Sequence, residues 1–161
     1  MTREFAFPGW RRRNPYLGIL WGGLIAGTLD IVAAFVNLGR RGIAPERILQ
    51  GIASGLLGRD SFRGGWATAA LGLACHFLIA FGAAAVYYAA SRWMRVLIER
   101  PVICGLLYGI PVYLFTNFVV IPLSKIGPRP VGPLSGVVIG LVVLMVFVGL
   151  PIALMVRRYS R

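Results

Sequence analysis

Asp30 and His76 are the residues of this sequence whose types and positions best suit chemistry inside a membrane. Each stands within a long apolar run, Asp30 in residues 16–38 and His76 in residues 66–90. An ionised side chain in hydrocarbon is costly unless water or a polar partner meets it, and such groups often mark proton relays or solute paths. The fold must therefore supply Asp30 with a partner or with water.

The two residues lie at similar depths in their runs. Asp30 lies about eight residues before the end of the first run, and His76 about ten residues after the start of the next, which returns from that side. At ~1.5 Å per residue these depths are roughly 12 and 15 Å. Asn117 lies about six residues before the end of the third run, somewhat nearer the same surface. These depths predict an intramembrane polar cluster of Asp30, His76, Asn117, Thr28 and Thr116.

The cluster has two main interpretations. In the first, Asp30 and His76 satisfy each other and fix the register of two helices, which is a structural role. In the second, they form a proton relay or a solute site. Contact with lipid or with a partner protein is a third interpretation. The sequence leaves all three open.

The sequence lacks the patterns that other intramembrane chemistries require. There is no HExxH metalloprotease motif, no CxxC pair, and one histidine cannot provide both axial ligands of a bis-histidine haem. A metal site would need His76, Asp30 and Cys75, and neighbouring residues on a helix point about 100° apart. We therefore expect no catalytic residue, no cofactor-binding residue and no metal site.

The composition is that of a membrane protein. Of the 161 residues, 58% are hydrophobic and 14% are charged, against about 25% charged in soluble domains. The formal net charge is +12, but the basic residues flank the apolar runs, where they meet lipid headgroups, so nucleic acid is not an expected partner. We predict an all-α polytopic membrane protein whose single integral membrane domain, residues 1–161, holds four transmembrane helices in a bundle. The expected spans are residues 16–38, 66–90, 101–123 and 133–156.

Two features of the sequence predict how the spans connect and pack. Residues 45–57, PERILQGIASGLL, have apolar residues at helical spacing, which predicts a short interfacial helix in the first connection; a lid over the bundle end is the alternative. Glycines four residues apart predict close helix contacts. They are Gly23, Gly27, Gly105, Gly109, Gly132, Gly136 and Gly140. Pro111 predicts a kink in the third span.

The basic residues predict that both termini are cytoplasmic. The N-terminal tail, the second connection and the C-terminal tail carry ten of the 17 Lys and Arg residues, in short segments. The first and third connections carry the other seven over a longer stretch. Cytoplasmic segments hold the excess of positive charge. The first run is longer than the 7–15 apolar residues of a signal peptide and no A-x-A site follows it, so we expect it to remain as a span.

Four segments carry a resemblance to known proteins: LIAGTLDIVAAF, LQGIASGLLG, GGWATAALGLACHFLIAF and RPVICGLLYGIPVYLFTNFVVIPLS. On these segments the chain resembles a family of small, uncharacterised bacterial inner-membrane proteins with four predicted spans. The resemblance covers residues 20–124 and leaves the fourth span outside it. It implies a bacterial inner (cytoplasmic) membrane. No activity is established for the family, so it assigns no role to any residue.

The expected function is that of a non-enzymatic integral membrane protein, an accessory or assembly subunit of a membrane complex. The alternative is a small transporter or proton-conducting protein that uses Asp30 and His76. Expected partners are membrane lipids, together with another membrane protein or a second copy of the chain. The sequence names neither a substrate nor an oligomeric state.

Overall fold

The structure is a computed structural model that describes residues 14–128, 130 and 132–160. Within these residues the chain is almost wholly helical and has no β-strand. The N-terminal tail, whose arginines contribute to the topology prediction, lies outside the described residues, as do Arg129 and Arg161.

Four helical segments are long and apolar enough to cross a membrane: Tyr16–Gly39, Gly65–Trp93, Pro101–Leu123 and Leu134–Ser160. The first two spans are the single helices α1 (Pro15–Gly39) and α3 (Gly65–Trp93). The third span joins α5 (Pro101–Phe115), the π-helical turn η2 (Thr116–Val120) and α6 (Ile121–Leu123). The fourth joins α7 (Leu134–Val143), the π-helical turn η3 (Leu144–Gly149) and α8 (Leu150–Ser160). The predicted all-α polytopic fold is confirmed, and the protein is a multi-pass integral membrane protein.

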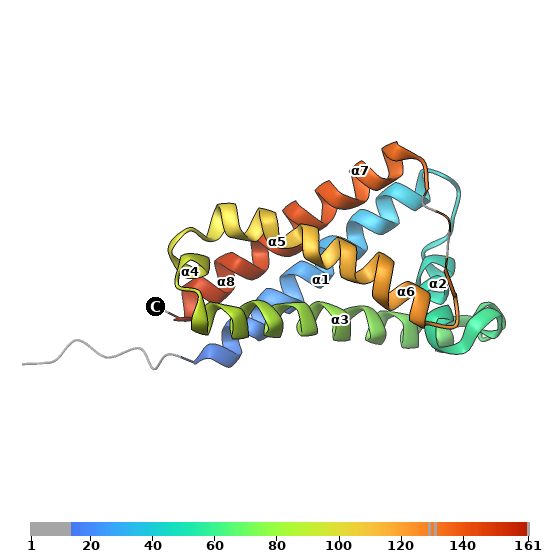
Figure 1. Cartoon of the computed structure of the whole chain (residues 1–161). Coiled ribbons are helices and arrows are strands. Elements are labelled where there is room, and N and C mark those ends of the chain that lie inside the picture. Colours follow the sequence, from blue (N-terminus) through green and yellow to red (C-terminus); the bar gives the residue numbers. More distant parts are fainter. Residues whose placement is uncertain (1–13, 129, 131, 161) are drawn as a thin grey trace, which may run out of the picture.

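Shorter elements mark the two ends of the bundle (Figure 1). At one end, here called the α2 end, the first connection forms α2 (Pro45–Leu57) and the 3₁₀ helix η1 (Gly58–Arg63). At the other, the α4 end, α4 (Val96–Glu99) lies beside the C-terminal part of α8. Gly58 ends α2 at a φ of 67°, a conformation that glycine adopts without steric cost.

The bundle is tightly packed towards the α4 end. There α1 packs against α3 on one side and α8 on another, and α5 packs on η3 and α8. The shared core contains small and branched side chains together with Tyr87, which is fully buried and donates a hydrogen bond to the carbonyl of Leu97 at 2.9 Å. The core residues are Ala26, Ala84, Tyr87, Val148, Ile152, Ala153 and Val156.

A separate, smaller core lies towards the α2 end. It joins Ile31 of α1, Leu49 of α2 and Ala69 of α3. The apolar face of α2 therefore packs on α1 and α3. The backbone of α2 approaches α3 so closely that a Cβ at Gly72 would overlap the carbonyl group of Leu49. Between these two cores, α3 and α5 touch along little of their length.

Two prolines explain the π-helical turns. The turn η2 ends two residues before Pro122, and η3 ends two residues before Pro151. Proline lacks an N–H donor and its ring clashes with the carbonyl four residues earlier, so the turn before it widens. By contrast, α5 continues through Pro111 as far as Phe115.

The glycines occupy different environments. A Cβ at Gly105 would lie 2.8 Å from Cβ of Ala153 and 2.9 Å from the carbonyl oxygen of Gly149. A Cβ at Gly109 would overlap the backbone of η3. At Gly140 the nearest atom is Cε2 of Tyr113, at 3.1 Å.

The other two glycines of the fourth-span stripe are open in the described part of the chain. No atom lies within 4 Å of a Cβ at Gly132, and a Cβ at Gly136 meets only Pro133 of its own segment. That Gly132 and Gly136 pack against a helix stays a prediction, and the helix would belong to a second copy of the chain or to another protein.

Candidate functional site

Asp30 and His76 lie on two helices that cross, α1 and α3. Gly23 and Gly27 face two phenylalanines of α3, Phe81 and Phe77, and a Cβ at Gly27 would lie 2.8 Å from the Phe77 ring. Glycine at these positions lets the two helices approach closely. His76, which precedes Phe77, is thereby brought to the α1 backbone.

His76 forms a hydrogen bond with the backbone of α1. Its Nε2 lies 2.8 Å from the carbonyl oxygen of Gly27. A carbonyl oxygen accepts only, so Nε2 carries the proton and donates it. In the neutral ring the remaining nitrogen, Nδ1, is then the proton acceptor. The ring of Phe77 packs edge-on against the imidazole, with centroids 5.5 Å apart, and helps to hold its orientation.

Asp30 lies one helical turn beyond the last core residue on its face of α1. Ala26 is fully buried in the core, and residues four apart on a helix share a face. Asp30 is only partly buried. Among the described residues, no donor hydrogen-bonds its carboxylate and no cationic group lies within 4.0 Å of it, His76 included.

The carboxylate of Asp30 remains accessible from outside the protein. Among the described residues, the fully buried side-chain atoms without a partner are Oε1 of Gln50 and Oγ of Ser160, and the oxygens of Asp30 are not among them. The carboxylate oxygens therefore keep some accessible surface, and an acid at membrane depth needs water or a polar partner to meet its charge.

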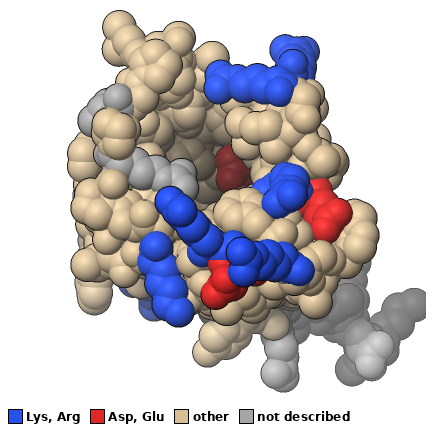
Figure 2. All heavy atoms as spheres, turned by 90° about the vertical axis from the view of Figure 1, so that its right-hand side faces the viewer, with Lys and Arg blue, Asp and Glu red and all other residues tan. Residues whose placement is uncertain are grey.

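The α2 end of the molecule is hollowed. Figure 2 shows a recess in the middle of this end, with an acidic side chain at the back of it and Lys and Arg side chains around the mouth. Three of the four described acids belong to the connections: Glu46 and Asp60 lie at the α2 end, on α2 and η1, and Glu99 lies on α4. Asp30 is the described acid that lies inside the bundle.

The recess does not continue to the α4 end. Below Asp30, the core formed by Ala26, Ala84, Val148 and Ile152 fills the space between α1, α3, η3 and α8. Val148 is 4% exposed and the other three are fully buried. The end of the bundle that holds α2 is therefore hollowed, and the core beyond Ala26 is closed.

The remaining residues of the predicted cluster lie apart from Asp30 and His76. Thr28 is exposed on α1. Thr116 lines a crevice between α3 and α5. Asn117 donates from its side chain to the carbonyl of Tyr113 at 2.9 Å and borders a pocket of about 300 Å³ beside the loop before α7. None of these three shares a described hydrogen bond with Asp30 or His76.

Sequence reasoning missed two features of this region. The hydrogen bond between His76 and Gly27 depends on where α1 crosses α3. The one sequence feature that indicated a close crossing is the pair of glycines in α1, Gly23 and Gly27. The crevice between α3 and α5 depends on how far two helices separate, which no local pattern encodes.

Comparison of the chain with protein-family models, with curated proteins and with solved structures gave no match. The functional conclusions therefore rest on the site itself.

Proposed function

We propose that the protein takes up protons, or another small cation, at Asp30 from the α2 end, and that it acts as a small transporter or proton-conducting protein. The observation that supports this proposal is the accessible carboxylate of Asp30, which has no described hydrogen-bond or ionic partner. An intramembrane acid without a protein partner needs water, a proton or a cation to meet its charge.

The alternative role, in which Asp30 and His76 only lock two helices together, fits the geometry less well. That role calls for a direct contact that satisfies both side chains. Instead, the described partner of His76 is the carbonyl of Gly27. Gly27 and His76 hold α1 to α3 without any help from Asp30.

His76 acts in this proposal as a positioning and proton-accepting group. The bond from Nε2 to Gly27 fixes the ring, and Nδ1 is left as the basic nitrogen. Asp30 and His76 lie on the two helices that cross at Gly27, Asp30 on α1 and His76 on α3, and this neighbourhood supports a joint role in the proposal.

Transport requires that the site also open to the other end. The core around Ala26, Val148 and Ile152 closes that direction in this structure. Alternation between two such states is the usual behaviour of membrane transporters, in which a site near the middle of the bilayer faces one side at a time. We place the chain in a bacterial inner membrane with both termini cytoplasmic, so that the recess at the α2 end opens to the periplasm.

The experiment is a proton-flux measurement in liposomes. The purified protein is reconstituted with a pH-sensitive dye inside, and a membrane potential drives proton entry. Wild type should acidify the vesicles faster than protein-free liposomes, and Asp30→Asn should lose this excess flux. The control is Thr28→Val, because Thr28 is exposed two residues from Asp30 and lies outside the recess in the proposal. Equal flux through wild type and Asp30→Asn would refute the proposal.

A second candidate function is that of an accessory or assembly subunit. It is favoured by α7, which buries none of its described residues and presents Gly136 without a helix against it. An exposed small residue on a span suits contact with another membrane helix. Co-purification with a larger complex in mild detergent, lost on Gly136→Leu, is the expected result for this role.

A further inference from the structure

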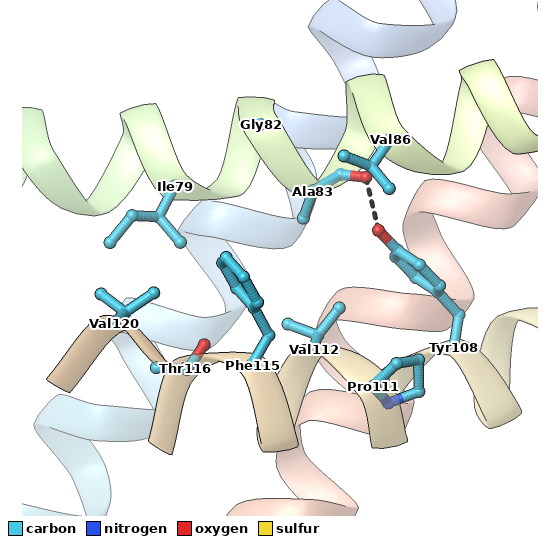
Figure 3. Close-up of a pocket in the computed structure, with 10 residues that line it drawn as sticks. All are labelled: Ile79, Gly82, Ala83, Val86, Tyr108, Pro111, Val112, Phe115, Thr116 and Val120. Atoms are coloured by element: carbon cyan, nitrogen blue, oxygen red, sulfur yellow. Dashed lines mark hydrogen bonds between the residues drawn. The ribbon is translucent and has the colours of Figure 1, made fainter. Parts of the chain in front are cut away.

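A lateral crevice separates α3 from α5 at membrane depth. Its volume is about 440 Å³, within the range of roughly 300–1,000 Å³ that is usual for small-ligand sites. One wall comes from α3 between Ile79 and Val86, and the other from Tyr108 to Val120 of the third span. Figure 3 shows these two walls facing each other, with Phe115 reaching across towards α3.

The crevice is mostly apolar. Its lining includes Ile79, Val86, Val112 and Phe115, and its described polar side chains are the hydroxyls of Tyr108 and Thr116. The Tyr108 hydroxyl is already engaged, because it donates to the carbonyl of Ala83 at 2.8 Å and ties α5 to α3 (Figure 3). An occupant of the remaining space needs to be apolar, and at this depth in a bilayer it is surrounded by acyl chains.

A basic pocket lies at the α2 end, where the third span ends. It is lined by Arg59, Phe62 and Lys125 together with Ser54, Gly58 and Ile126, and has a volume of about 280 Å³. A third cation adjoins it, since the Arg47 guanidinium lies 5.7 Å from the centroid of the Phe62 ring. Among the described residues, neither Arg59 nor Lys125 forms a salt bridge, and Asp60 does not line the pocket.

The distance between the two sites suits one amphiphilic molecule. Val120 is the last crevice residue along the third span, and the helix ends at Leu123, about 5 Å further on at a rise of ~1.5 Å per residue; Lys125 lies two residues after that end. Lys125 is held in place because its backbone N–H donates to the carbonyl of Gly55 at 2.9 Å. Lys125 also follows Leu123, the last residue of the third span, which puts the pocket at headgroup level.

We propose that this surface binds an anionic phospholipid, with one acyl chain in the crevice between α3 and α5 and the phosphate at Arg59 and Lys125. Charge complementarity selects an anionic headgroup, and the apolar walls select a hydrocarbon chain. A helix of a partner protein would leave the cations of the basic pocket without a counter-charge. The lipid joins the third span to α2 and η1, which are far apart in sequence.

The test is native mass spectrometry of the full chain, purified in nonionic detergent and offered equal amounts of phosphatidylglycerol and phosphatidylcholine with identical acyl chains. Wild type should retain one phosphatidylglycerol, with roughly tenfold preference over phosphatidylcholine. The double variant Arg59→Gln, Lys125→Gln should lose the preference. Its control is Arg95→Gln, which removes an exposed charge beside α4 at the other end of the bundle.

A second variant tests the acyl-chain half of the site. No atom of the described residues lies within 4 Å of a Cβ at Gly82, so Gly82→Leu places a side chain in the crevice without a clash. This variant should retain neither lipid, whereas Gly136→Leu, on the open face of α7, should bind as wild type does. Thermal unfolding in detergent shows that each variant is folded.

Three results would overturn the lipid proposal. They are equal retention of the two lipids by wild type, unchanged lipid retention by Gly82→Leu, and binding of glycerol phosphate without acyl chains as strongly as the whole lipid.

Discussion

At the scale of single residues, the site depends on which group each polar side chain meets. His76 is bound to the Gly27 carbonyl, whereas Asp30 has no hydrogen bond and no direct ion pair among the described residues. A histidine held by a backbone carbonyl keeps a fixed orientation and a free Nδ1. That arrangement suits proton exchange with Asp30 better than it suits a permanent ion pair.

The first prediction concerns coupling between these residues. Asp30→Ala and His76→Ala should be non-additive in unfolding free energy, with an interaction term of about 0.5–3 kcal/mol, because each charge alters the electrostatic energy of the other. Chemical unfolding of wild type, both single variants and the double variant in detergent measures the term. Additivity within ~0.3 kcal/mol would mean that His76 acts only through Gly27.

The second prediction concerns the hydrogen bond between Tyr108 and Ala83. Tyr108→Phe should lower the unfolding free energy by about 0.6 kcal/mol, and by no more than ~1.5 kcal/mol, which is usual for one hydrogen bond between membrane helices. The control is Tyr113→Phe, since none of the described hydrogen bonds uses the Tyr113 hydroxyl. Both variants are compared by thermal unfolding. An equal loss in both would show that the bond to Ala83 contributes nothing.

The sequence indicated part of this site. The depths of Asp30 and His76 in their spans follow from counting residues, and the structure places the two residues on helices that cross, with His76 bound to Gly27 of α1. Counting residues does not show how α1 crosses α3. Whether the two side chains point towards each other depends on that crossing. For the same reason Thr116 and Asn117, although close in depth, border other spaces.

At the scale of elements, hydrophobicity and proline explain most of the architecture. The lengths of the four apolar runs were sufficient to predict the spans, because bilayer thickness fixes the length of a transmembrane helix. The sequence analysis did not predict the π-helical turns. In the third span it predicted a kink at Pro111, whereas the π-helical turn precedes Pro122. In the fourth span the π-helical turn η3 likewise precedes a proline, Pro151.

The third prediction compares two glycines in different surroundings. Gly109→Ala should destabilise the protein by about 1–3 kcal/mol, because the added methyl meets the backbone of η3, which cannot move as a side chain can. Gly136→Ala should be neutral or stabilising by up to ~1 kcal/mol, since alanine favours the helix and the position is open. Unfolding in detergent measures both. Equal effects would contradict the packing of α5 on η3.

At the scale of the whole molecule, the bundle is closed at the α4 end and hollowed at the α2 end. A site that opens to one side has a direction, so its function depends on how the chain is oriented in the membrane. The distribution of Lys and Arg over the connections predicts that orientation.

The fourth prediction is that both termini are cytoplasmic. Green fluorescent protein fused to the C-terminus should fluoresce, and alkaline phosphatase fused there should be inactive, because the phosphatase needs the oxidising periplasm to form its disulfides. The same reporters in the loop before α7 should give the opposite pattern. An active phosphatase at the C-terminus would place the recess on the cytoplasmic side.

The accessibility of residue 30 tests the central claim most directly. Asp30→Cys, made with Cys75→Ala and Cys104→Ala so that no other thiol reacts, is treated in oriented vesicles with a membrane-impermeant thiol reagent added at the α2 end. The expected result is that residue 30 is modified from this side and not from the other, while Ala26→Cys, one turn deeper in the closed core, is not modified. Arg41→Cys, exposed at the same end, serves as the positive control. If Arg41→Cys reacts and Asp30→Cys does not, the recess does not reach Asp30 and the proposed cation site is wrong.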